Sequence, residues 1–372
     1  MNKKLIAVAV AGALGAPGVA LAQASTVQIY GRFLIDYGVH VRQPNTAAGL
    51  SRHNADLLDS SSSRIGFKGE EKLGGGLSAW FQCESTLELF PADTATWCTR
   101  NSALGLKGGF GNVYIGTWDS PLKVAVATTR MTNNAGLLGT RHMLLRGPKG
   151  TGFDGASAAS GNFSLRNRNS VNYESPQFGG FQARAQYTTQ QNALDAPSTD
   201  ARAKRRNLGL GADYRQGPVV VAAAWARHED VAVAGRDDTG WALGATYKIG
   251  EFKGGITYTD LKKEPAPTTD IKRKSWNLAL EYDMSGPGSI LLVYTHAGNF
   301  TGTAPGAGPD TGAKKWMIGY HHSLSKRTVA GVSYVHLRNE ARGAYTLSES
   351  FSTTDVLGGT ASAFVLSLVH RF

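Results

Sequence analysis

Seven short turns rich in glycine, proline or serine recur along this chain at a nearly constant interval. They centre on Gly75, Gly111, Gly179, Gly217, Gly250, Gly286 and Ser325. Successive turn centres lie 36, 68, 38, 33, 36 and 39 residues apart. A tilted strand that spans a membrane needs ~10 residues, so two such strands and one longer loop fill about one interval. Seven turns divide the chain into eight hairpins, which predicts sixteen antiparallel strands.

The segments between these turns alternate apolar and polar residues with the period of two that is typical of strands. Near the start of the chain, Ile29, Phe33 and Tyr37 share one face, and Arg32 and Asp36 share the other. Similar runs are Phe181–Tyr187, Trp241–Tyr247, Trp276–Tyr282, Trp316–Tyr320 and Phe364–Phe372. Aromatic residues stand at the ends of these runs, as the girdles of a membrane barrel require. We therefore predict an all-β fold, a 16-stranded antiparallel transmembrane β-barrel.

Residues 1–22 have the features of a secretory signal peptide that is cleaved from the mature protein. Lys3 and Lys4 precede an apolar run, and an Ala-x-Ala pattern predicts cleavage before Gln23, with cleavage after Ala24 as the alternative. An N-terminal membrane anchor would need ~20 apolar residues, and this segment falls short. Residues 23–372 then form one barrel domain, and removal of the two lysines lowers the net charge from +11 to about +9.

Several other classes of protein are excluded by the sequence. No apolar run near 18 residues follows the signal peptide, so we predict no transmembrane helix. The basic charge is not gathered into a basic-aromatic motif, which argues against a nucleic acid partner. His142, His321, His322 and His336 show neither a nucleophile-elbow nor a metal-ligand spacing. We predict that the protein is not an enzyme and binds no metal or other cofactor.

The two cysteines, Cys83 and Cys98, are 15 positions apart on either side of a short segment that contains Pro91. An exported protein meets oxidising conditions, so a disulfide across this segment is one interpretation. The alternative is two unpaired thiols on opposite strand faces, because counting residues across a loop does not fix which face each thiol occupies.

One interval departs from the regular spacing, and the excess lies in the 49 residues from Trp118 to Arg166. This stretch does not alternate, and a long segment without regular structure inside a compact domain is usually functional or disordered. Its basic residues are Lys123, Arg130, Arg141, Arg146, Lys149 and Arg166, against the acidic Asp119 and Asp154. A sixteen-stranded barrel encloses an aqueous channel that its own wall does not fill. We predict that this third loop folds into the lumen and narrows it.

Five other long segments are polar and rich in glycine, proline or threonine, and we predict that they are outward loops. They are Arg42–Ser62, Thr189–Arg206, Asp260–Ser275, Ala297–Lys314 and Leu337–Thr354.

Stretches along the whole mature chain resemble the trimeric general porins of Gram-negative outer membranes, in the branch common in beta-proteobacteria. The stretches are Val27–Gly31, Ser63–Gly76, Asn169–Gly180, Leu324–Thr328 and His370–Phe372. The resemblance implies a homotrimer among outer-membrane lipid and lipopolysaccharide, with the third loop folded inward as an eyelet. It also implies that Phe372 is read by the barrel-insertion machinery. The chain departs from the family at Thr117-Trp118, where Arg-Gln is common, and in a less acidic third loop.

The resemblance also implies a set of channel-facing residues. Matching motifs assign channel-facing arginines to Arg64, Arg100 and Arg166, and an acidic partner to Glu84. Arg64 and Arg100 have an alternative as residues at the barrel rim that extend to lipid headgroups. For Arg166 the alternative is Arg168, which has the same parity along the strand.

Four residues of the third loop complete the candidate constriction without a motif to assign them. Arg130 and Arg141 either line the eyelet or are solvated loop charges, and the same alternatives apply to Arg146. Trp118 either lines the constriction or anchors the loop to the wall. Asp119 is the acidic candidate beside it.

Fixed positive charge replaces part of the hydration that a small anion loses in a narrow pore. Arginine suits this task because it stays charged and offers several donors in a fixed fork. We predict a water-filled channel for the passive diffusion of small hydrophilic solutes, with a preference for anions. One alternative is a solute-specific channel for organic anions such as carboxylates, with a binding site at the basic third loop. Another is a surface adhesin or structural barrel without a useful pore.

Overall fold

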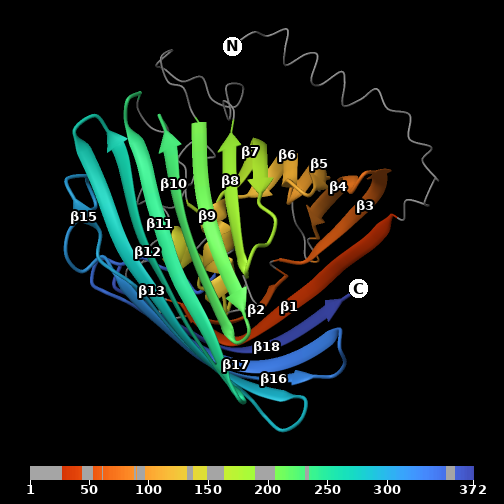
Figure 1. Cartoon of the computed structure of the whole chain (residues 1–372). Coiled ribbons are helices and arrows are strands. Elements are labelled where there is room, and N and C mark those ends of the chain that lie inside the picture. Colours follow the sequence, from red (N-terminus) through yellow and green to blue (C-terminus); the bar gives the residue numbers. More distant parts are fainter. Residues whose placement is uncertain are drawn as a thin grey trace.

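The computed structural model describes residues 27–43, 53–60, 62–87, 89, 97–131, 137–148, 163–188, 206–230, 234–348 and 357–372. The predicted signal peptide, and Lys149 and Asp154 of the third loop, lie outside the described residues. The described strands curve into one closed sheet, with the two ends of the wall side by side (Figure 1).

The first half of the wall consists of β1 (Gln28–Gln43), β2 (His53–Asp59), β3 (Arg64–Gly74), β4 (Leu77–Thr86), β5 (Ser102–Gly108), β6 (Gly111–Asp119), β7 (Arg166–Glu174), β8 (Phe181–Thr188) and β9 (Arg206–Gln216). The second half consists of β10 (Val219–Glu229), β11 (Asp237–Ile249), β12 (Phe252–Ala266), β13 (Thr269–Asp283), β14 (Gly288–Ala297), β15 (Thr301–Gly302), β16 (Ala313–Ser323), β17 (Thr328–Asn339) and β18 (Thr360–Arg371).

Sixteen of these strands form the barrel, and each pairs antiparallel with its neighbour along the chain. The short β15 pairs with β13, and β2 lies along β1 beyond the end of β3. The barrel closes where β1 pairs antiparallel with β18, from Arg32 opposite Arg371 to Arg42 opposite Ser362. This confirms the sixteen-stranded antiparallel barrel predicted from the turn spacing.

The alternation in the sequence separates the two faces of the wall. On β13 and β14, Leu278 and Leu292 are exposed on the outer face, while Asn277 and Thr295 are buried on the inner face. Apolar residues that face outward and polar residues that face inward are what a membrane barrel requires, and a soluble sheet would show the reverse. Among the described residues, no helix is long and apolar enough to cross a membrane.

The prediction of an outward loop at Asp260–Ser275 was wrong. β12 continues to Ala266 and β13 begins at Thr269, so a two-residue turn joins two long strands. Polar residues such as Lys272 and Lys274 suggested a loop, but they occupy outward positions of a strand beyond the apolar band. The period of two persists there, because Arg273 is buried between these exposed lysines and Ile271 is buried just before them. β17 likewise continues to Asn339, beyond the predicted start of a loop.

The third loop contains two helices that the sequence analysis did not predict, α2 (Pro121–Thr129) and α3 (Arg141–Leu145). Ser120 caps α2, because its side chain accepts a hydrogen bond from the amide of Lys123, and Pro121 occupies the first turn. α2 packs against β9, β10, β11 and β12, which come after the strands that carry it in the order around the wall. Figure 1 shows the helices enclosed by the strands.

Small residues on the inner face of β9 to β12 allow this close approach. A Cβ atom at Gly209 or Gly211 would lie 2.7 or 3.1 Å from the ring of Pro121. The hydroxyls of Thr129 and Thr257 are 2.8 Å apart, which joins the end of α2 to β12.

Lys315 of β16 anchors the segment between α2 and α3. Its ammonium donates to the carbonyls of Leu137 (3.0 Å), Gly139 (2.6 Å) and Leu347 (2.8 Å), and the residue is 1% exposed. Leu347 belongs to the connection between β17 and β18. One buried cation therefore joins the third loop, the wall and a second loop.

We expect Lys315→Met to loosen the third loop while the barrel remains intact. Hydrogen bonds from a charged donor contribute about 1.5–3 kcal/mol each. A loss of about 3 kcal/mol would therefore raise the population of the state in which the third loop is detached from the wall on the order of 100-fold. Single-channel recordings should then show frequent transitions between conductance levels. Lys314→Met is the matched control, because Lys314 is exposed on the outer face of the same strand. If Lys315→Met showed no more transitions between conductance levels than the wild-type protein, the anchoring role would be contradicted.

Candidate functional site

Glu84 holds two arginines on the inner face of the wall. It lies near the end of β4, and its carboxylate is 2.6 Å from Nε of Arg100 and 3.4 Å from Nε of Arg64. The hydroxyl of Tyr30 donates to the same carboxylate at 3.2 Å. Arg64 stands on the neighbouring strand, where β3 and β4 are in register, and the amide of Arg100 donates to the carbonyl of Glu84 at 2.9 Å.

The two cysteines form a disulfide, which decides between the alternatives that the sequence left open. Cys83 precedes Glu84, and Cys98 is two residues before Arg100. The bond, together with a hydrogen bond of 2.9 Å from the Cys98 amide to the Ser85 hydroxyl, holds the start of the next segment against β4. Arg100 is therefore fixed to the strand that carries its carboxylate partner.

Asp119 is the second carboxylate of the site and ends β6. Its side chain is 2.7 Å from Nζ of Lys123 and 2.9 Å from Nε of Arg166. Lys123 lies four residues later on the first turns of α2, and Arg166 is the residue opposite Asp119 in the pairing of β6 with β7.

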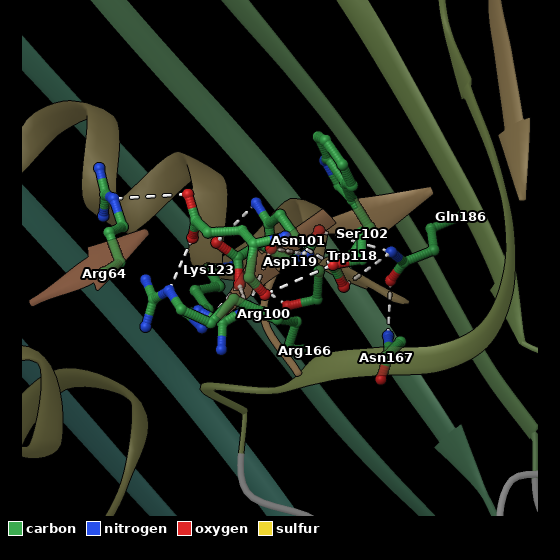
Figure 2. A network of polar contacts seen from close by, with 12 residues as sticks. Arg64, Arg100, Asn101, Ser102, Trp118, Asp119, Lys123, Arg166, Asn167 and Gln186 are labelled. Atoms are coloured by element: carbon green, nitrogen blue, oxygen red, sulfur yellow. Dashed lines mark hydrogen bonds and ion pairs between the residues drawn. The ribbon is translucent and has the colours of Figure 1, made fainter. Parts of the chain in front are cut away.

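Asn101 links the two carboxylate clusters. Its side-chain oxygen accepts from Nε of Arg166 at 2.9 Å and from the amide of Asp119 at 3.2 Å, and its nitrogen donates to Asp119 at 3.3 Å. Because Asn101 follows Arg100 in the chain, both clusters form one network. Figure 2 shows Arg64, Arg100, Lys123 and Arg166 on one side of this network, and Gln186 and Asn167 on the other.

The structure thus brings together the predicted residues Arg64, Arg100, Arg166, Glu84 and Asp119. Arg168, the alternative to Arg166, is exposed, and the positive φ of its neighbour Asn169 marks an irregularity of the strand.

Sequence reasoning missed Lys123 as a member of the network. The signal was present, because Ser120-Pro121 is a helix start and Asp119 stands four residues before Lys123. Arg32 was also missed, although it is the cross-strand partner of Arg64.

The other candidates of the third loop lie around the network. Arg141 begins α3 and is close enough to Lys123 to repel its charge. Arg130 directly follows α2, seven residues and ~10 Å along the helix from Lys123. Trp118 packs edge-on against Tyr114, with ring centroids 4.9 Å apart, which favours an anchoring role on the wall.

The charges of the network do not cancel. Four cations, Arg64, Arg100, Lys123 and Arg166, surround the two carboxylates of Glu84 and Asp119. Each carboxylate contacts its arginines at Nε. Among the described residues, the Nη atoms of these three arginines donate no hydrogen bond, and the side chains are 32% (Arg64), 15% (Arg100) and 19% (Arg166) exposed.

A family model for Gram-negative porins matches residues 7–342 of the chain. The chain belongs to the Gram-negative porin family. It is therefore an outer-membrane porin, and porins are channels rather than enzymes. The porin is 31% identical to outer membrane porin protein 32 of Delftia acidovorans over 387 aligned positions, which cover 98% of this chain and all of the relative. It is 25% identical to the major outer membrane protein P.IB of Neisseria gonorrhoeae, with full coverage of both.

Solved structures agree on the fold of this porin. An anion-selective porin from Comamonas acidovorans superposes with a TM-score of 0.73 at 24% identity, over 94% of this chain and all of the other. The trimer form of OmpT from Vibrio cholerae superposes with a TM-score of 0.65 at 18% identity, over 94% of this chain and all of the other.

We expect Glu84→Gln to increase the preference for chloride over potassium. The substitution removes one of two negative charges beside the arginines, and one charge at ~7 Å in water is worth about 0.6 kcal/mol, or about threefold in the permeability ratio. The measurement is the reversal potential across a KCl gradient. Glu70→Gln is the matched control on the inner face, because Glu70 pairs with Lys107 toward the other end of the wall. A decrease in chloride preference would contradict this prediction and show that the displacement of Arg64 and Arg100 outweighs the removal of a negative charge.

Proposed function

We propose that this porin is a passive diffusion channel whose preference for anions is set by the network around Glu84 and Asp119. The observation that carries the proposal is the excess of cations with free Nη edges on the inner face of the wall. Small hydrophilic solutes would pass this point as they cross the outer membrane. The third loop, packed across the inner face from β6 to β12, would narrow the lumen there.

The physical basis is partial replacement of hydration. An anion that enters a narrow, low-dielectric passage loses some of its water, and fixed cations offset that cost. Arginine edges offer donors in a plane, so a chloride or a carboxylate can pass from one edge to the next without a tight site. The two carboxylates then act as supports, because they hold Nε and leave the remaining donors free.

The names of two similar proteins support this proposal. One solved structure with the same fold is an anion-selective porin, and another is described in a trimer form. We propose a homotrimer for this chain as well, with cleavage of residues 1–22 as a signal peptide before assembly.

Phe372 is proposed as the residue read by the insertion machinery. Its backbone pairs with Gly31 at the barrel seam, and its side chain is 38% exposed.

The test is the reversal potential of the purified protein in a planar bilayer across a KCl gradient. We expect a potential directed toward the chloride equilibrium value, and we expect Arg100→Ala and Arg166→Ala each to reduce the chloride preference about threefold. Arg327→Ala is the matched control, since Arg327 is exposed in the turn between β16 and β17. A potential directed toward potassium in the wild-type protein would overturn the proposal.

The same bilayer distinguishes a diffusion channel from a solute-specific one. A general channel keeps a current that rises in proportion to the concentration of an organic carboxylate. A current that saturates, and a chloride current that the carboxylate blocks, would instead indicate a binding site at the third loop.

A further inference from the structure

Three aromatic side chains form a cluster on the inner face of the wall, where a water-filled channel is usually lined by polar residues. They are Trp80 of β4 and Tyr114 and Trp118 of β6, with ring centroids 4.9 to 5.8 Å apart. The neighbouring residues Phe81 and Ile115 are exposed on the outer face, so the alternation of the strands places Trp80 and Tyr114 on the lumen side. The lumen of this porin therefore contains an aromatic surface.

Gly105 of β5 fixes the orientation of Trp80. It is the cross-strand partner of both Trp80 and Tyr114, and a Cβ atom there would lie 2.6 Å from Cε2 of the Trp80 indole. One side of the indole thus rests on the wall, and its N–H donates to the side chain of Asn112 at 2.7 Å. Trp80 is nevertheless partly exposed. Because the wall covers one side of the ring, the exposed part faces the channel.

Trp118 stands steeply against Trp80, with an interplanar angle of 69° and a centroid distance of 5.8 Å. Two rings at this angle form a corner, in which a third aromatic ring can stack with an offset on one of them and pack edge-to-face against the other. Trp118 is partly exposed, and its indole N–H donates no hydrogen bond to any residue that the structure describes. The corner therefore offers a solute both aromatic contact area and a hydrogen-bond donor.

Trp118 and Asp119 both contact inner-face residues, although they are consecutive in the chain. The pairing of β6 with β7 shifts register between Gly116 and Trp118, so the regular alternation is interrupted there. Trp118 contacts the ring of Trp80, and Asp119 lies 2.9 Å from Nε of Arg166. The aromatic corner and the charged network consequently border one another on the inner face (Figure 2).

The part of the network that borders the corner has donors for an anion. Among the described residues, the Nη atoms of Arg100 and Arg166 donate no hydrogen bond. Small-molecule sites combine apolar or aromatic surface with a few polar groups that fix the orientation of the ligand. A guanidinium presents donors in a plane that matches a carboxylate. Tryptophan rings beside such donors are therefore suited to a solute with one flat ring and one carboxylate.

We propose that the corner between Trp80 and Trp118 binds aromatic carboxylates, which makes them a preferred class of organic anion in this channel. The ring of the solute packs between the two indoles, and its carboxylate accepts hydrogen bonds from Arg100 or Arg166. A sugar ring also stacks on tryptophan, but the excess of cations beside the corner favours a negatively charged solute. This inference rests on the proposed function, because it assigns a preferred solute to an anion channel.

The experiment measures how organic solutes reduce the KCl current of the full-length mature protein in a planar bilayer. The probes are benzoate, cyclohexanecarboxylate, which has the same charge and a saturated ring, and benzamide, which has the same ring and no charge. We expect benzoate to halve the current at a concentration about fivefold below that of cyclohexanecarboxylate, the factor of one favourable contact between aromatic rings. Benzamide should be about tenfold weaker than benzoate, because it lacks the charge that the arginines attract.

Trp80→Leu removes one side of the corner and leaves the charged network in place. We expect it to abolish the preference for benzoate over cyclohexanecarboxylate and to leave the reversal potential in a KCl gradient unchanged. Trp80→Phe, which keeps an aromatic ring, should retain most of the preference. Trp118→Leu should also abolish the preference, and it serves as a second variant if Trp80→Leu forms no channel.

Trp241→Leu is the matched control. Trp241 also belongs to an aromatic pair, because its ring centroid is 5.2 Å from that of Tyr258, but it is exposed on the outer face of β11. This variant should retain the full preference for benzoate. A loss of the preference in Trp241→Leu as well as in Trp80→Leu would overturn the proposal, since it would indicate a general effect on the barrel.

The reversal potential in KCl, measured without an organic solute, reports on the charged network alone. A potential directed toward potassium would overturn the proposed function, whereas a chloride-directed potential with equal inhibition by benzoate and cyclohexanecarboxylate would overturn only the aromatic site. Two further results would also overturn the site. One is a preference for benzoate that persists in both Trp80→Leu and Trp118→Leu, and the other is stronger inhibition by glucose than by benzoate, which would indicate a site for sugar rings.

Discussion

Closure of the sheet is the constraint on which the rest of this porin depends. In lipid, no water is present to satisfy an open strand edge, and each unpaired backbone group costs several kcal/mol. β1 must therefore pair with β18, although the two strands lie at opposite ends of the chain. Once the wall is closed, its outer face must be apolar and its inner face must border water. The alternation visible in the sequence follows from these two environments.

The closed wall also decides where the polar network is placed. Its residues come from β3, β4, the segment just before β5, β6, β7 and the start of α2, which are brought together only because successive strands lie side by side. Glu84 and Asp119 sit where strands end and irregular segments begin, so each carboxylate orients cations from two elements at once. The carboxylates hold the guanidinium groups in position but do not neutralise them, because four cations surround two carboxylates.

Sequence patterns predicted the wall well and the third loop only in outline. Turn spacing gave the sixteen strands because a spanning hairpin has a nearly fixed length. It failed at Lys272 and Lys274, because strands continue beyond the membrane, where polarity no longer distinguishes a strand from a loop. Lys123 was missed because the helix that presents it has nine residues and a weakly amphipathic sequence. The pairing of Cys83 with Cys98 depends on strand parity across an irregular segment, which residue counting does not give.

The glycines beneath the third loop have a consequence for how sequences of this kind can diverge. A Cβ atom at Gly244 would lie 2.2 Å from the Thr129 hydroxyl, and one at Gly255 would lie 2.5 Å from the sulfur of Met131. A side chain at either position would require Thr129 or Met131 to move, whereas Gly254, next to Gly255 but on the outer face, has open space. Adjacent glycines on β12 therefore differ in mutational tolerance: Gly255 lies against the third loop, and Gly254 borders the membrane.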